Sequence, residues 1–156
     1  EKRDLEIIFD FLGEQCEEII IIKGNHDNYL LNFAARRKKI AVKDVYAWRD
    51  YCFIHGDSDF PEIYDNRIRY WVMGHLHPAI TLQKGVKSEK YKCFLVGDFK
   101  DKKVIIVPSF LEASEGGDIR DFSNNLAWDF KLKNFKVKIV GESLEVLDFG
   151  KLRDIK

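Results

Sequence analysis

The stretch Ile19-Ile20-Ile21-Ile22-Lys23-Gly24-Asn25-His26-Asp27 organises the rest of this 156-residue chain. Four consecutive β-branched isoleucines are typical of a short strand that is buried on both faces of a sheet, and Gly24 ends it. An amide, an imidazole and a carboxylate follow at once. Because ligands of open α/β sheets bind outside the carboxyl ends of the strands, this stretch predicts a functional site at the strand exit.

Two later stretches repeat the pattern of an apolar run that ends in histidine. They are Cys52-Phe53-Ile54-His55-Gly56-Asp57 and Trp71-Val72-Met73-Gly74-His75-Leu76-His77-Pro78. The chain has four histidines, and all of them lie in these three strand exits. Histidines placed at random would rarely be distributed in this way, so we expect the three exits to meet at one site.

The side chains at these exits are of the kind that bind transition metals. Asn25 offers an amide oxygen, and His55, His75 and His77 offer imidazoles. In an extended segment, residues i and i+2 project to the same side, so His75 and His77 are expected to face one pocket and serve two neighbouring ions. Imidazole combined with oxygen ligands suits Mn, Fe, Zn, Co or Ni and disfavours Ca.

Taken together, the three blocks resemble the GNH[DE], single-His and GHxH motifs of the calcineurin-like metallophosphoesterases, in the same order along the chain. Val107-Pro108-Ser109-Phe110, followed by Gly116-Gly117, is similar to the PAF…GG segment of the small archaeal and bacterial phosphoesterases related to SbcD-type nucleases, with serine in place of alanine. The resemblance covers about residues 5–120. The remaining residues carry no motif of this family.

The resemblance implies an α/β (α+β) fold, a four-layer α/β/β/α sandwich of two mixed sheets. It implies two divalent transition ions, Mn being favoured over Fe, Zn, Ni and Co. Asn25, His55 and His75 would ligate one ion and His77 the other. His26 would lie close to the scissile phosphate and either donate a proton to the leaving oxygen or stabilise the developing charge, and Asp27 would orient His26 by hydrogen bonding. The reaction implied is attack by a metal-bound hydroxide on a phosphoester, favouring a phosphodiester and including nuclease activity, with a nucleic acid among the candidate substrates.

The chain also departs from the family, because in the family a DxH motif and a GDxx[DH] motif lie on two strands before this region, and neither motif precedes Ile19–Asp27 in residues 1–156. We therefore expect one metallophosphoesterase domain over 1–156 that is incomplete at its N-terminus. Such a chain would hold fewer than two ions, would be inactive alone, and would associate through an open sheet edge beside Ile19–Ile22. The alternatives are that a separate chain supplies the missing strands, or that this is a non-catalytic binding module or scaffold with an incomplete metal site.

The local patterns predict an α/β first part and a mostly β second part. An amphipathic helix is expected over Lys2–Glu17 and short helices over residues 29–34 and Phe60–Tyr64. The expected strands are Ile40–Val45, Tyr46–Trp48, Tyr51–Ile54, Arg69–Met73, Ile80–Leu82, Tyr91–Val96, Val104–Val107, Phe135–Val140 and Leu144–Leu147, with a hairpin turn at Arg49-Asp50.

Composition narrows the class of protein further. The 26 basic and 26 acidic residues give a net charge of +0, which makes no global case for a nucleic-acid binder. The run Arg36-Arg37-Lys38-Lys39 is either a solvated turn or a phosphate contact.

No apolar run reaches the roughly 18 residues of a membrane span. Cys16, Cys52 and Cys93 have no CxxC spacing, which favours reduced, buried thiols in a cytoplasmic protein.

Overall fold

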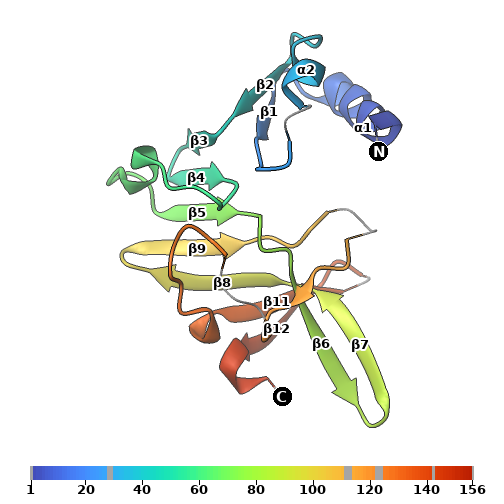
Figure 1. Cartoon of the computed structure of the whole chain (residues 1–156), viewed down its shortest axis with the longest axis vertical. Helices are drawn as coiled ribbons and strands as arrows, with labels where there is room; N and C mark the ends of the chain where they lie inside the picture. Colours follow the sequence, from blue (N-terminus) through green and yellow to red (C-terminus); the bar gives the residue numbers. More distant parts are fainter. Residues whose placement is uncertain (1, 28–29, 111–113, 122–124, 142, 156) are drawn as a thin grey trace.

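The chain has a mixed α+β fold in the computed structural model, as the sequence predicts (Figure 1). The structure describes residues 2–27, 30–110, 114–121, 125–141 and 143–155, with the side chains of residues 2–5 and 84 excepted. The helices are α1 (Lys2–Gln15) and α2 (Leu30–Ala34), with 3-10 turns η1 (Pro61–Tyr64), η2 (Leu132–Asn134) and η3 (Leu152–Asp154). The strands are β1 (Ile19–Ile22), β2 (Ile40–Lys43), β3 (Val45–Trp48), β4 (Tyr51–Ile54), β5 (Tyr70–Met73), β6 (Pro78–Lys84), β7 (Lys87–Lys92), β8 (Phe94–Phe99), β9 (Lys102–Ile106), β10 (Gly117–Asp118), β11 (Lys136–Val140) and β12 (Val146–Lys151).

A seven-stranded sheet in the order β12-β11-β8-β9-β5-β4-β3 forms the body of the molecule. Its middle strands β4, β5 and β9 are parallel, and the remaining neighbours pair antiparallel. Arg49 turns the chain between β3 and β4 with a positive φ of 56°, so the predicted hairpin turn is confirmed. Because β4, β5 and β9 run the same way, their carboxyl ends lie at one edge of the sheet.

The strand of isoleucines is less buried than its sequence predicts. β1 pairs in parallel with β2, and these two strands form a separate sheet in the described part of the chain. All four isoleucines are half-buried. The prediction of burial on both faces is therefore wrong for these residues, because an apolar run specifies a buried strand only when other elements cover it.

In α1, Phe9 packs on Phe33 with ring centroids 5.2 Å apart, whereas Ile7 and Phe11 are 61% and 62% exposed.

A third sheet, β10-β6-β7, brings the hydrogen-bonded sheets among the described residues to three, where the sequence predicts two. The predicted strand Tyr91–Val96 is in fact two strands. It is divided at Cys93, which is fully buried and lies between β7 in the third sheet and β8 in the large one. The predicted strand Ile80–Leu82 is confirmed within β6, and the predicted strand Phe135–Val140 is confirmed from Lys136 onward as β11.

The core lies on the large sheet and is rich in aromatic rings. Trp71 on β5 is fully buried, its Nε1–H donates to Ile63 O at 3.0 Å, and its ring lies 5.4 Å from that of Trp128. Phe99, Phe130 and Phe135 continue the cluster. The C-terminal third, which carries no recognised motif, therefore closes the core of the large sheet.

The three cysteines are all free thiols, and two of them are buried as predicted. Cys52 and Cys93 lie in the core, but Cys16, just after α1, is exposed, so the prediction is wrong for Cys16. Desolvation raises the pKa of Cys52 to about 11 and that of Cys93 to about 12. Among the described helices, none is both long and apolar enough to cross a membrane.

Candidate functional site

The histidines lie where the parallel strands end. His55 follows β4, and His75 and His77 follow its neighbour β5. The Gly74 N–H donates to His55 O at 3.0 Å, which holds the two exits together. Asn25 and His26 follow β1, so the smaller sheet supplies the remaining predicted side chains. Val107 and Pro108 leave β9 at the same edge.

Three predicted metal ligands converge on one point. His55 Nε2 lies 3.1 Å from Asn25 Oδ1 and 3.1 Å from His75 Nδ1. The rings of His55 and His75 meet edge to face, with centroids 4.9 Å apart. The structure thus brings together one side chain from the smaller sheet and two from the large sheet.

Gly24 allows this approach between the two sheets. A Cβ at Gly24 would lie 2.8 Å from His55 Cε1 and 3.0 Å from His55 Nδ1, closer than side chains normally pack. The residue that ends the strand of isoleucines is therefore also the residue against which the His55 ring rests. A larger side chain would displace either His55 or the turn that carries Asn25.

His75 and His77 lie on a turn and not on the extended segment that the sequence predicts. Their φ angles are 61° and 47°, in the left-handed region that residues other than glycine and asparagine seldom adopt. Leu76 between them is 2% exposed and belongs to the core. The buried leucine anchors the turn, and such strained backbone is concentrated at functional sites.

The two predicted catalytic residues lie beside the histidine cluster. Asn25 Nδ2 donates to His26 Nε2 at 3.3 Å, and the Gly24 N–H donates to Asp27 Oδ2 at 2.8 Å. Asp27 therefore closes the turn Gly24–Asp27, and no hydrogen bond joins it to His26 among the described contacts. The predicted hydrogen bond between Asp27 and His26 is therefore not seen among these contacts, and Asp27 influences His26 through the backbone turn that carries both residues.

The surroundings of His55 and His77 lower the pKa of both imidazoles. Burial lowers the pKa of His55, the neighbouring His75 lowers it further, and the carboxylates of Asp57 and Asp27 oppose these effects. Burial also lowers the pKa of His77, and His75, Lys92 and His26 act in the same direction. Neutral imidazoles are the form that binds metal ions.

Two residues near the site were missed in the sequence. The charge of Lys92 lowers the pKa of His77, and Lys92 Nζ donates to Ser109 O at 3.1 Å. Lys92 is placed there by the pairing of β7 with β6, in which it lies opposite Ala79. Asp44 lines a cavity of about 190 Å³ beside Asn25 and Asp57. Asp44 follows β2, the parallel partner of β1, so the rule of strand exits applied to β2 would have found it.

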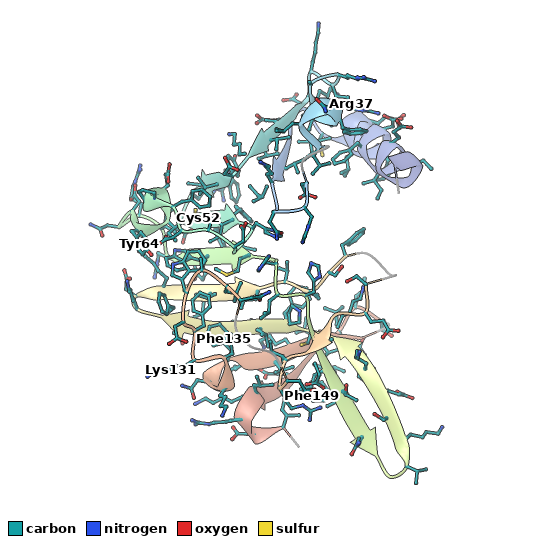
Figure 2. All side chains as sticks on the ribbon, viewed as in Figure 1. Arg37, Cys52, Tyr64, Lys131, Phe135 and Phe149 are labelled. Carbon is teal, nitrogen blue, oxygen red and sulfur yellow. The ribbon has the colours of Figure 1, made fainter. Side chains whose placement is uncertain are left out.

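The basic run has a structural role in part. Lys39 Nζ donates to Gly13 O at 2.6 Å and to Cys16 O at 3.3 Å, which caps the carboxyl end of α1. Arg37 lies between α1 and α2 (Figure 2), 3.5 Å from Asp10 Oδ1 and 3.9 Å from the centre of the Phe33 ring. Arg36 and Lys38 are exposed.

The donor set fits a transition ion in part. Around an ion with bonds of about 2.1 Å, two ligands at right angles lie about 3 Å apart, close to the two separations of 3.1 Å at His55 Nε2. A single proton on Nε2 cannot serve both neighbours well, whereas a shared cation would satisfy all three atoms. Within the described residues, however, no group of three or more His, Cys, Asp or Glu side chains is arranged to hold an ion.

Comparison with known proteins supports the fold alone. No family model matches the sequence, and no curated protein matches it. Among solved structures, the crystal structure of Pseudomonas putida nuclease MPE is similar, with a TM-score of 0.52 and 18% identity over 85% of this chain. The matched part is 54% of that protein, so the present chain spans about half the length of its structural neighbour.

Proposed function

We propose that this chain carries the histidine-bearing part of a metal-dependent phosphodiesterase that acts on nucleic acid. The observation that carries the proposal is the convergence of Asn25 Oδ1, His55 Nε2 and His75 Nδ1, each within 3.1 Å of its neighbour, at the carboxyl ends of parallel strands. The fold similarity to a protein described as a nuclease supports nucleic acid as the substrate class.

In this proposal Asn25, His55 and His75 hold one divalent transition ion, favouring Mn²⁺, and His77 contributes to a second. When bound, two such ions would supply Lewis-acid polarisation of the phosphate and a lower pKa for the attacking water. Their effect depends on ligands that are already fixed before the ion binds. Gly24 and Leu76 supply this rigidity. Gly24 lets the His55 ring rest against the turn that carries Asn25, and the buried Leu76 anchors the turn that carries His75 and His77.

His26 is proposed as the proton donor to the leaving oxygen. In the resting state its Nε2 accepts from Asn25 Nδ2, so the ring lies beside a proposed metal ligand, and His26 would take up a proton from solvent before it donates one to the leaving oxygen. Asp27 acts as a positioning residue, because its carboxylate holds the Gly24 N–H and thereby shapes the turn that presents Asn25 and His26. General acid catalysis of this kind contributes about 10²–10⁴-fold to the rate.

The test is hydrolysis of bis(p-nitrophenyl) phosphate and of a quenched DNA oligonucleotide with Mn²⁺ titrated, in the longest expressed form of the protein. His26→Ala should retain Mn²⁺ and lose about 10²–10⁴-fold in kcat. His75→Ala should lose Mn²⁺ affinity and turnover together. A folded His26→Ala variant that no longer binds Mn²⁺ would contradict the role given to His26.

The second candidate is a non-catalytic module that uses the same fold to bind a partner. The observation that favours it is the lack, among the described residues, of a cluster of three or more His, Cys, Asp or Glu side chains. It predicts no Mn²⁺-dependent hydrolysis at any Mn²⁺ concentration, with the fold unchanged in His75→Ala.

A further inference from the structure

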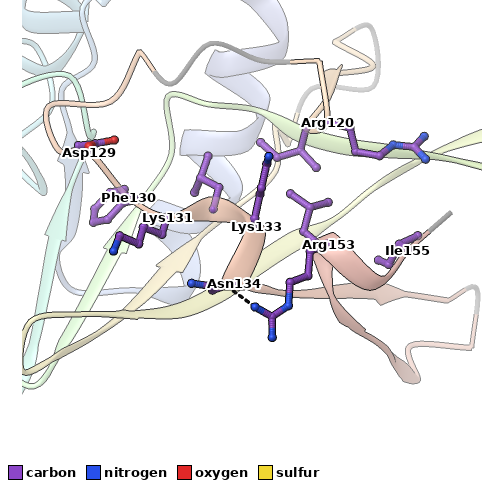
Figure 3. A pocket seen from close by; sticks show the side chains of 11 residues that line it. Arg120, Asp129, Phe130, Lys131, Lys133, Asn134, Arg153 and Ile155 are labelled. Atoms are coloured by element: carbon purple, nitrogen blue, oxygen red, sulfur yellow. Dashed lines mark hydrogen bonds between the residues drawn. The ribbon is translucent and has the colours of Figure 1, made fainter.

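Two adjoining cavities lie in the C-terminal third of the chain, where η2 and η3 meet, and Figure 3 shows the residues that line the larger of them. The larger has a volume of about 690 Å³ and the smaller, which extends to the β8–β9 turn, about 560 Å³. Both are lined by Asp129, Lys131, Asn134 and Arg153, so they adjoin, and the two together are called the hollow. None of the six predicted site residues lines either cavity.

The lining of this hollow is positively charged, although the whole chain has a net charge of +0. Its cations are Lys100, Arg120, Lys131, Lys133, Lys151 and Arg153, and its carboxylates are Asp98 and Asp129. Asp98 is paired with Lys103 at 2.5 Å, Arg120 with Asp118 at 2.7 Å, and Arg153 with Asp154 at 3.7 Å. Lys131 and Lys133 are exposed, and no ion pair joins either of them to a described carboxylate. The hollow therefore presents excess positive charge to solvent.

The floor of the hollow is apolar. Phe130 and Leu152 line it and are 4% and 5% exposed, and Leu132 and Ile155 are half-buried. Arg153 Nη1 donates to Asn134 Oδ1 at 3.0 Å, which fixes a polar bridge between η2 and η3 (Figure 3). Cations above an apolar floor suit a ligand that carries separate negative charges and flat apolar groups.

We propose that this hollow binds single-stranded nucleic acid, with backbone phosphates on Lys131, Lys133 and Arg153 and bases over the apolar floor. A duplex presents its phosphates but hides its base faces, whereas a single strand presents both. The choice of nucleic acid among anionic ligands rests on the proposed function. The binding itself does not require the histidine cluster, because that cluster lies at the carboxyl ends of β1, β4 and β5.

The test is fluorescence anisotropy of a labelled single-stranded DNA of about twelve nucleotides, within the usual site size of such proteins, in EDTA so that no hydrolysis occurs. Lys131→Glu/Lys133→Glu should weaken binding at least tenfold. It should also lower the slope of log K against log salt by about 1.4, because each phosphate contact on a single strand contributes about 0.7. Arg36→Glu/Lys38→Glu is the matched control, since it reverses two exposed charges elsewhere, and it should change affinity less than twofold.

Equal losses in both double variants, or a loss only in Arg36→Glu/Lys38→Glu, would overturn the proposal. So would unchanged binding by Lys131→Glu/Lys133→Glu, or tighter binding of a duplex of the same length. His75→Ala separates this proposal from the proposed function: it should abolish Mn²⁺ binding and leave oligonucleotide affinity unchanged. Loss of oligonucleotide binding in folded His75→Ala would show that the strand binds at the histidines.

Discussion

The smaller sheet β1–β2 and the large sheet differ in packing, and the candidate site is built from both. The four isoleucines of β1 are all half-buried, whereas Trp71 and Met73 of β5 are 0% and 1% exposed. Asn25 and His26 come from the first region and His55 and His75 from the second. The comparison teaches that the site depends on the contact between a loosely packed element and a rigid one, made at Gly24 and His55.

The largest effect is expected in the large sheet. Trp71→Ala should lower the free energy of unfolding by about 3–5 kcal/mol, because it leaves a cavity and removes the Nε1–H donor to Ile63 O. Urea unfolding followed by far-UV circular dichroism measures it. Ile20→Ala in β1 is the matched change and should cost clearly less, since Ile20 is half-buried. Equal losses would show that the two regions are packed alike.

The next effect concerns Asp118 of β10, whose side chain is 10% exposed. It accepts from Arg120 Nε at 2.9 Å, from Arg120 Nη2 at 2.7 Å and from the Thr81 N–H at 2.8 Å. The Arg120 side chain holds the pKa of Asp118 well below its usual range. The ionised carboxylate therefore stabilises the fold above its unfolded pKa of about 3.9, and this contribution falls as the pH drops below that value.

Asp118→Asn should accordingly cost about 1.5–3 kcal/mol at pH 7, the range of charge-assisted hydrogen bonds, and the difference from wild type should narrow on going from pH 5 to pH 3. Urea midpoints across this pH range measure it. A loss that stays constant down to pH 3 would mean that the ionised carboxylate is not what stabilises β10 against β6. Asp148→Asn, at an exposed ion pair of β12, is the control and should cost under about 1 kcal/mol.

Gly24→Ala is expected to change stability less than the two previous substitutions, but to act directly on the candidate metal site. The added methyl would lie against His55, so the ring must shift by a few tenths of an ångström. We expect Mn²⁺ affinity to fall about tenfold, as for loss of a supporting contact around a metal site. Gly13→Ala, where the added methyl meets nothing within 4 Å, is the control. Unchanged Mn²⁺ affinity in Gly24→Ala would show that the contact between Gly24 and His55 does not support metal binding.

The smallest perturbation uses the thiols as reporters of the two regions. Cys16 is exposed, whereas burial raises the pKa of Cys52 to about 11 and that of Cys93 to about 12. Because the thiolate is the reactive form, Ellman's reagent at pH 8 should react quickly with one thiol per native chain. Peptide mapping should find the label on Cys16, and all three thiols should react in urea. Rapid labelling of Cys52 in the native protein would show that the edge of the large sheet opens.

The convergence of the candidate side chains could be predicted better than the backbone that carries them. The rule that polar side chains after apolar strands meet at one edge places Asn25, His55 and His75 together. The turn at His75 and His77 could not be predicted, because the burial of Leu76 depends on the core around it. The pattern of residues along Tyr91–Val96 likewise does not show that Cys93 divides two sheets, since the whole run reads as one continuous strand.

The central claim is that Asn25, His55 and His75 share one ion, and Mn²⁺ binding to residues 1–156 tests it most directly. Isothermal calorimetry with electron paramagnetic resonance of free Mn²⁺ gives stoichiometry and affinity together. We predict one site of moderate affinity, lost in His75→Ala and in Asn25→Ala and retained in His26→Ala, with unchanged circular dichroism in all three. Two tight sites in this chain, or Mn²⁺ binding that survives His75→Ala, would show that other side chains hold the ion and would contradict the account.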